Sequence, residues 1–281
     1  MAQINGKGSA DWLSGTLFDD IIKGFDGDDT LIGRDGDDAI FGGDDSDRLV
    51  GNRGNDTVEG GKGEDVLFGN DGDDILRDES GDDTLNGGDG DDTLDAGEGN
   101  DRLNGGSGND LMRAGEGNDT MSGGSGNDRM YAGSGNDDIK AGHGNDYIHA
   151  DEGNDTIKAG GGHDTLIGGE GDDIMLGGGG HDILRGGEGN DLLNGGTGKD
   201  VMTGGVGADT FVFTHAHDVI TDFEPGDDQI DLTAIDGVHR FQDVLAAAQT
   251  VGDDIRLDFG AHQLTLVGIS VSQLDSDDFI L

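Results

Sequence analysis

The strongest constraint on this chain is a period of nine residues. Counting from Asp11, every ninth residue is an aspartate as far as Asp209, which gives 23 in succession. An apolar side chain follows each aspartate by two residues, from Leu13 to Phe211, and glycine precedes it by two residues in 20 of the 23 copies. A helix, linker or inserted domain would break this count. Such a short fixed repeat is typical of a solenoid, in which each unit buries its apolar face against its neighbours.

The repeat from Gly123 to Tyr131 shows what one unit is expected to form. It opens with Gly-Gly-Ser-Gly, which predicts a tight turn in backbone conformations that favour glycine. The last three residues suit a very short strand, in which side chains alternate between faces. We therefore expect Asp128 and Met130 to point inwards and Arg129 to point outwards.

Two repeats are needed to close one coil, because a single nonapeptide supplies only one turn and one strand. One coil then consists of two nonapeptides, with a strand on each side. Neighbouring coils would lie about 4.8 Å apart, which is the strand spacing of a sheet, and 23 repeats predict roughly 11 coils over on the order of 55 Å. The expected fold class is all-β: a parallel β-roll, or β-helix solenoid, with a thin core of Leu, Ile, Val and Met between two parallel sheets.

Stacked coils would place the aspartates in two columns. Two unit charges about 4.8 Å apart repel by about 0.9 kcal/mol in water, and by more where they are partly buried. Over columns of about 11 residues the repulsion exceeds the free energy of unfolding of a typical domain. The chain has 62 Asp and Glu against 16 Lys and Arg, a formal charge of −46. We therefore expect the metal-free fold not to hold, and a divalent cation to lie between the carboxylates.

The available ligands select calcium. The turns offer carboxylate and carbonyl oxygens, the chain has no Cys, and such a set favours a hard cation. Ca²⁺ takes about 6–8 oxygens in a flexible shell, which is more than one nonapeptide supplies. Each ion should therefore be shared between a turn and the equivalent turn two repeats away. Roughly 20 ions per chain would add about +40 and nearly offset the charge of −46.

The unit Gly-Gly-x-Gly-x-Asp-x-apolar-x resembles the calcium-binding nonapeptide of the RTX (repeats-in-toxin) family, a β-helix repeat. The resemblance spans residues 6–211. It implies a right-handed parallel β-roll with Ca²⁺ in its turns, folded outside the cell. The predicted metal ligands are Asp29, Asp38, Asp56, Asp65, Asp74, Asp83, Asp92, Asp101, Asp110, Asp119, Asp128, Asp137, Asp146, Asp155, Asp164, Asp173, Asp182, Asp191, Asp200 and Asp209.

Some repeats depart from the motif, which leaves their occupancy open. Asp11 and Asp20 lack the turn glycine, and Asp44-Asp45-Ser46 replaces it before Asp47. Two further turns open with substituted residues, namely Asp78-Glu79-Ser80 and Ala150-Asp151-Glu152.

The pattern changes after Phe211, so we divide the chain into a β-roll at residues 1–211 and a small mixed C-terminal cap with a secretion signal at residues 212–281. Apolar spacing predicts a helix around residues 241–248, and a hairpin is expected from residues 254–259 and 263–267. Residues 209–232 resemble the C-terminal domain of serralysin-type proteases. The final Asp278-Phe279-Ile280-Leu281 resembles the uncleaved signal of that group for type I secretion.

We find no catalytic motif and expect no enzyme activity, since the His-Glu-x-x-His zinc motif and the Gly-x-Ser-x-Gly elbow are missing. His215 and His217 are interpreted as polar residues at a junction, with a transition-metal pair as the alternative. His163 and His181 should stack in successive turns as surface residues, again with a zinc pair as the alternative.

The sequence thus predicts a secreted, extracellular calcium-binding protein that folds from a disordered polyanion into a rigid roll and acts as a structural or binding module. The repeats begin at residue 6, which we take to favour a free-standing protein. The alternative is the C-terminal secretion domain of a larger toxin, protease, lipase or polysaccharide-modifying enzyme.

The negative charge argues against nucleic acid as a partner, and no stretch is long and apolar enough for a membrane span. The expected partners are calcium ions and the type I secretion apparatus, and the candidates beyond these are a surface polysaccharide or a second copy. An outward apolar ladder of Ile32, Val50 and Phe68 is read as strand propensity, with a subunit contact as the alternative.

Overall fold

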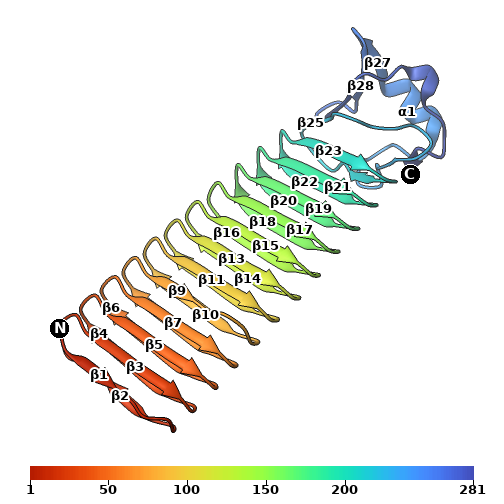
Figure 1. Cartoon of the computed structure of the whole chain (residues 1–281). Helices are drawn as coiled ribbons and strands as arrows, with labels where there is room; N and C mark the ends of the chain where they lie inside the picture. Colours follow the sequence, from red (N-terminus) through yellow and green to blue (C-terminus); the bar gives the residue numbers. More distant parts are fainter. The chain divides into compact units, whose positions relative to one another are not determined.

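A computed structural model describes residues 1–281. The fold is an all-β parallel β-solenoid of about 13 turns with about 18 residues per coil and 4% helix, and it confirms the fold class predicted from the nine-residue period (Figure 1). The chain forms two compact units, Met1–His143 and Gly144–Leu281. The boundary that we place between residues 211 and 212 stays a prediction.

In Met1–His143 successive strands alternate between two parallel sheets. The first sheet contains β1 (Gln3–Asn5), β3 (Ile21–Asp26), β5 (Ala39–Asp44), β7 (Thr57–Lys62), β9 (Ile75–Arg77), β11 (Thr93–Glu98), β13 (Leu111–Glu116) and β15 (Arg129–Ser134). The second contains β2 (Trp12–Ser14), β4 (Thr30–Asp35), β6 (Arg48–Arg53), β8 (Val66–Asp71), β10 (Thr84–Asp89), β12 (Arg102–Ser107), β14 (Thr120–Ser125) and β16 (Asp138–His143).

Gly144–Leu281 continues the alternation and then adds antiparallel strands. One sheet has the order β17 (Tyr147–Glu152), β19 (Thr165–Glu170), β21 (Ile183–Glu188), β23 (Val201–Val206), β25 (His217–Ile220), β29 (Gln263–Leu266), β28 (Asp254–Asp258) and β27 (Ala248–Val251). The other has the order β18 (Thr156–Gly162), β20 (Ile174–Gly180), β22 (Leu192–Gly198), β24 (Thr210–Val212), β26 (Gln229–Asp231) and β30 (Phe279–Ile280).

Neighbouring strands of a sheet pair with a register that joins residues one coil apart in the sequence. In β10 and β12, for example, Leu85 lies opposite Leu103, so equivalent positions of successive coils stack on one another. Both leucines are fully buried, whereas their neighbour Asn86 is half-buried. The column aspartates are buried beside the leucines, so the predicted inward and outward faces are confirmed.

The strands are longer than the three residues predicted. Most have six residues and run into the glycine-rich segment; β10, for instance, ends at Asp89. The reason is that the turn backbone is paired as well, since Gly88 lies opposite Gly106 in the next coil. Gly88 has a φ of 122°, and a Cβ on it would overlap the carbonyl of Asn70 in the preceding coil. Glycine is therefore needed here by both the backbone conformation and the close stacking.

The C-terminal segment contains the predicted helix and hairpin. Helix α1 spans Phe241–Ala247, and β28 and β29 pair in antiparallel fashion. β29 also pairs in parallel with β25, and β30 pairs in parallel with β26, so these strands cover the last regular coil of their unit. A short 3₁₀ helix spans Val271–Gln273. No helix of the chain has the length and apolar character required to cross a membrane.

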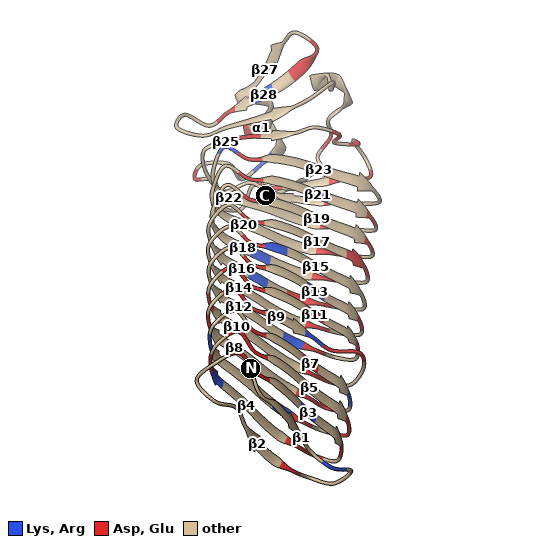
Figure 2. Ribbon diagram, turned by 60° about the vertical axis from the view of Figure 1, so that its left-hand side comes forward, with Lys and Arg blue, Asp and Glu red and all other residues tan.

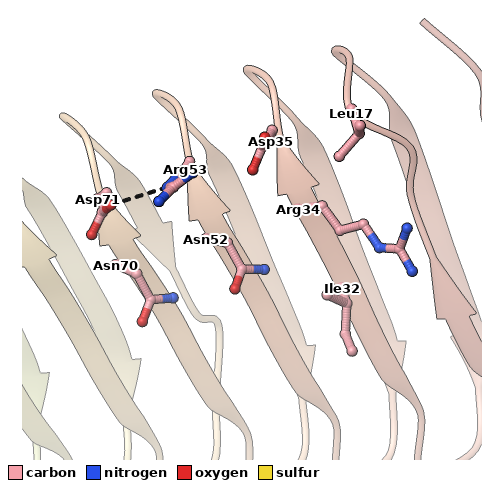
Figure 3. Close-up of a pocket in the computed structure, with 8 residues that line it drawn as sticks. All are labelled: Leu17, Ile32, Arg34, Asp35, Asn52, Arg53, Asn70 and Asp71. Atoms are coloured by element: carbon pink, nitrogen blue, oxygen red, sulfur yellow. Dashed lines mark ion pairs between the residues drawn. The ribbon is translucent and has the colours of Figure 1, made fainter.

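The predicted outward ladder is present in β4, β6 and β8, where Ile32, Val50 and Phe68 lie opposite one another and are half-buried. The Arg48 guanidinium lies 4.6 Å from the centre of the Phe68 ring. A shallow hollow beside this ladder is lined by polar groups, including the Arg53–Asp71 ion pair at 3.5 Å (Figure 3). The ladder is thus partly covered by its own neighbours, which fits the interpretation as strand propensity.

We predict that Leu85→Ala destabilises the calcium-loaded protein by about 2–5 kcal/mol, because it leaves a cavity in a core that cannot close over it. Asn86→Ala, on the outer face of the same strand, should change the free energy of unfolding by less than about 0.5 kcal/mol. Urea unfolding of both variants at saturating Ca²⁺ checks this. Equal effects of the two substitutions would contradict the assigned faces.

Candidate metal sites in the turns

Each column aspartate is held by the backbone of a neighbouring coil. The Asp29 amide donates to Asp47 Oδ1 at 2.7 Å, and the Asp47 amide donates to Asp65 Oδ1 at 2.6 Å. The same link recurs in the second unit, where the Asp164 amide donates to Asp182 Oδ1 at 2.9 Å. One carboxylate oxygen of each residue is thus fixed, so the side chain cannot rotate towards solvent.

The other carboxylate oxygen has no donor. Oδ2 is buried and lacks a hydrogen-bond partner in Asp29, Asp38, Asp47, Asp56, Asp65, Asp74, Asp83, Asp92, Asp101, Asp110, Asp119, Asp164, Asp173, Asp182, Asp191 and Asp200. A buried acceptor without a partner costs about 1–3 kcal/mol, and more when it is charged. Such an oxygen, repeated in successive turns, indicates a positively charged ligand.

The surroundings of these oxygens are themselves rich in oxygen. A Cβ placed on Gly105 would overlap Asp110 Oδ2 and lie 2.8 Å from the carbonyl oxygen of Gly123, one coil further on. A Cβ on Gly106 would overlap the carbonyl of Gly88, one coil earlier. Carboxylate and carbonyl oxygens of two successive turns therefore meet where no side chain fits. This donor set suits Ca²⁺, which binds several oxygens in a flexible shell.

Burial makes the ionised form of the column aspartates unfavourable. Burial, together with the charges of Asp56 and Asp92 in the same column, raises the pKa of Asp74 to about 7, although the hydrogen bond from the Asp56 amide opposes the shift. Burial likewise raises the pKa of Asp173 to about 7 and that of Asp38 to about 6. A bound dication would oppose both causes.

All twenty predicted ligand aspartates lie buried at the turns. Asp47, whose occupancy the sequence leaves open because its turn lacks glycine, is buried in the same way. Asp47 Oδ2 is buried without a donor, like Oδ2 of Asp29 and Asp65 in the same column. Asp45 takes the place of the turn glycine with a φ of 81°, a conformation that Asp adopts more readily than most residues. The unbroken spacing of Asp47 and Leu49 was the signal that could have identified this turn.

The first turns of the chain are different, because hydrogen bonds occupy their carboxylates. Asp20 Oδ1 accepts from the Ala2 amide at 2.5 Å. Its Oδ2 accepts from the amide and the hydroxyl of Thr16 at 2.6 and 2.8 Å. These bonds, led by the one from Ala2, lower the pKa of Asp20. Asp11 Oδ2 similarly accepts from the Lys7 amide at 2.6 Å. The Asp20 carboxylate thus has no oxygen left without a donor.

The far end of the columns also closes with hydrogen bonds. Asp228 accepts from the amides of Asp209 and Glu224 at 2.9 and 2.8 Å, one on each oxygen. Asp278 accepts from the amides of Gly226 and Asp275 at 2.8 Å each. Backbone donors therefore replace a cation in the C-terminal segment.

Four of the histidines pack in two ring pairs. The rings of His163 and His181 stack with centroids 4.9 Å apart, as predicted. The His181 amide donates to His163 Nδ1, and the Lys199 amide donates to His181 Nδ1, both at 2.8 Å. The proton of each neutral ring then lies on Nε2, which leaves no free lone pair for zinc. His215 packs edge-on against His262, with the ring centroids 5.3 Å apart.

We predict that the metal-free protein is more stable at pH 5 than at pH 7.5. A carboxyl whose pKa is raised on folding contributes stability below its unfolded pKa, about 4, and that stability is lost as the pH rises through its folded pKa. The folded pKa values of about 6 to 7 at Asp38, Asp74 and Asp173 place the loss between about pH 4 and pH 7. Circular dichroism of dilute, dialysed protein checks this; β-structure that increases with pH in the absence of metal would contradict it.

We also predict that Asp92→Asn reduces the number of bound Ca²⁺ and lowers the stability of the loaded protein by about 3–5 kcal/mol, because it removes one partner of a buried ion pair. Asp91→Asn is the matched control. Asp91 is exposed and accepts from the Asn109 amide at 2.7 Å, and asparagine holds the equivalent place in the next coil. Isothermal titration with Ca²⁺ compares the two variants, and equal losses would show that charge alone, rather than the buried oxygen, matters.

Comparison with known proteins supports this assignment. The RTX calcium-binding nonapeptide repeat family matches residues 5–40, 41–76, 68–103, 78–112, 104–139, 113–148, 141–175, 149–184 and 176–211. No curated protein matches the sequence significantly. The match ends at residue 211, so the serralysin-type resemblance beyond it stays a prediction.

Among solved structures, the solution structure of the AlgE6R3 subunit from the Azotobacter vinelandii mannuronan C5-epimerase is 31% identical, covering 44% of this chain and 80% of its own, with a TM-score of 0.36. The extracellular lipase LipA from Serratia marcescens is 19% identical, covering 78% and 40%, with a TM-score of 0.36. A Ca²⁺-dependent β-helical antifreeze protein from an Antarctic bacterium is 20% identical, covering 82% and 83%, with a TM-score of 0.48. Because the family match extends over residues 5–211, most of the 281 residues, this chain belongs to the RTX calcium-binding nonapeptide repeat family.

Proposed function

We propose that the protein is a secreted calcium-binding module whose chain is disordered inside the cell and folds into a rigid β-roll on binding roughly 20 Ca²⁺ ions outside it. The observation that carries the proposal is the series of buried Oδ2 atoms without donors. Two columns of such oxygens oppose folding until dications lie among them. A formal charge of −46 then keeps the unbound chain expanded.

Calcium supply would decide where the chain folds. Extracellular calcium modules work at about 10⁻⁴–10⁻³ M, well above the range of cytosolic sensors. RTX repeat proteins are typically secreted. A chain that cannot fold in the cytosol suits export in the unfolded state, and the type I secretion apparatus is the route that the sequence resemblance implies.

The C-terminal residues fit the same order of events. Asp278 is buried and accepts two backbone hydrogen bonds, and Phe279 is buried in β30. In the folded protein these residues belong to the cap. If residues 278–281 are a secretion signal, the secretion apparatus would therefore recognise them before the cap folds.

We further propose that the folded roll acts by binding or by structure rather than by catalysis. Its support is the division of the repeat: successive turns bury the same carboxylate, whereas the outward positions of the strands vary from repeat to repeat. Figure 2 shows these strands stacked side by side in each sheet. Such a rigid face suits a surface polysaccharide or a second copy of the chain as partner.

We predict that the purified chain shows a disordered circular dichroism spectrum in excess chelator at pH 7.5, with a radius of gyration on the order of 60 Å by X-ray scattering. Millimolar Ca²⁺ should produce a β-spectrum and a compact particle in a cooperative transition, whereas Mg²⁺, which prefers a small strict octahedron, should act far more weakly. A β-spectrum and compact dimensions in the chelator at this pH would refute the folding switch.

A further inference from the structure

One position inside the turns distinguishes a single coil from the rest. The residue five places before each column aspartate points inwards, and it is glycine in 16 repeats and alanine in six. The remaining repeat has Asp78 at this position. In the next coil of the same stack the equivalent residue is Ala96, which is fully buried. Asp78 therefore places a carboxylate where the other turns have at most a methyl group.

Asp78 brings a third carboxylate to a pair of column aspartates. Ligand oxygens of Asp65, Asp78 and Asp83 all lie within 4.8 Å of one another. Asp65 and Asp83 are each only 1% exposed. In all three residues Oδ2 is buried and has no hydrogen-bond partner.

The three side chains are fixed in this arrangement by their other oxygens. Asp65 Oδ1 accepts from the Asp47 amide at 2.6 Å, and Asp83 Oδ1 accepts from the Asp65 amide at 2.8 Å. Asp78 Oδ1 accepts from the amides of Glu79 and Gly61 at 2.8 and 3.2 Å. Backbone donors thus hold each carboxylate with its second oxygen directed at the other two.

No neighbouring lysine neutralises this cluster. Lys62, on β7, pairs with Asp44 at 3.1 Å instead. A cavity beside Asp78 is lined by Glu59, Gly61, Arg77, Asp78 and Glu79, which gives a cation a route past two further carboxylates.

We propose that Asp65, Asp78 and Asp83 form a calcium site of a different kind from the repeat sites, which binds Ca²⁺ more tightly and fills first. Affinity in oxygen-ligand calcium sites rises with the number of charged ligands and with the rigidity of the site. This site has three carboxylates, and backbone hydrogen bonds hold each of them in place. The ordinary sites have two column carboxylates, and this one has two column carboxylates, Asp65 and Asp83, with the Asp78 carboxylate as a third. The proposal rests on the proposed calcium binding by the columns, because Asp65 and Asp83 belong to them. It adds an order of filling, in which the coils around β7 to β10 are the first to form.

The test is equilibrium dialysis of the full-length chain against buffers of fixed free Ca²⁺, with bound calcium counted by mass spectrometry. Wild type should retain one ion at a free Ca²⁺ concentration about tenfold or more below that at which the others bind. Asp78→Ala, which installs the residue of the next coil, should lose this ion and keep the others. Asp78→Asn, which keeps the side-chain shape, should lose it as well.

Asp95→Ala is the control for a change of net charge. Asp95 lies on β11, half-buried on the outer face opposite Arg77, and its removal should leave the tight ion in place.

Burial raises the pKa of Asp78 to about 9, so the competing explanation is that the Asp78 carboxyl keeps its proton and binds no cation. In that case the Ca²⁺-binding curves of wild type and both Asp78 variants would coincide, or the variants would bind Ca²⁺ more tightly. Either result would overturn the inference about Asp78 and leave calcium binding by the columns intact. A chain that binds no Ca²⁺ at all would overturn both.

Discussion

The structure depends on one unfavourable arrangement, a buried carboxylate oxygen without a donor that recurs in successive turns. The backbone amide of the preceding coil fixes Oδ1 of each aspartate, and this leaves Oδ2 among other oxygens. Because the link joins equivalent residues of successive coils, each carboxylate lies between two turns and would serve the cation on either side of it. Neighbouring sites then share ligands. Such sharing explains why filling of the repeat sites and folding of their coils are expected to be cooperative, since a coil contacts only its neighbours and gains its stability from them.

The ends of the columns show how the same fold proceeds without a cation. At Asp20 the amide and hydroxyl of Thr16 donate hydrogen bonds to Oδ2, the oxygen that has no donor in the interior turns. At Asp228 and Asp278 the amides of the C-terminal segment do so. At each end, hydrogen-bond donors thus take the place that a cation would have beside the carboxylate. The turns between them have carbonyl oxygens at the equivalent place, so a cation is the partner that remains.

Much of this could be predicted from the period alone. A strict nine-residue repeat with inward Asp and Leu leaves only the coil of two nonapeptides, the two parallel sheets and the buried columns. Strand length was wrong, because pairing of turn backbones such as Gly88 with Gly106 depends on the stacking distance and not on side-chain pattern. Occupancy of the Asp47 turn was left open because Asp45 replaces the turn glycine, and sequence alone could not show that Asp45 adopts the positive φ that glycine has in other turns. The cluster at Asp78 could not be foreseen, since Asp65, Asp78 and Asp83 come together only after the coils stack. The hydrogen bonds of Asp20 could not be predicted either, because they depend on the backbone conformation at Thr16.

A crystal structure of the calcium-loaded protein, with anomalous scattering measured near the calcium edge, would show whether cations lie in the columns. We expect a column of anomalous peaks between successive turns, each contacting Oδ2 of equivalent aspartates in neighbouring coils, with no peak at the Asp20 carboxylate. A well-ordered roll whose interior Oδ2 atoms contact only water or one another, with no anomalous density between the turns, would contradict this expectation.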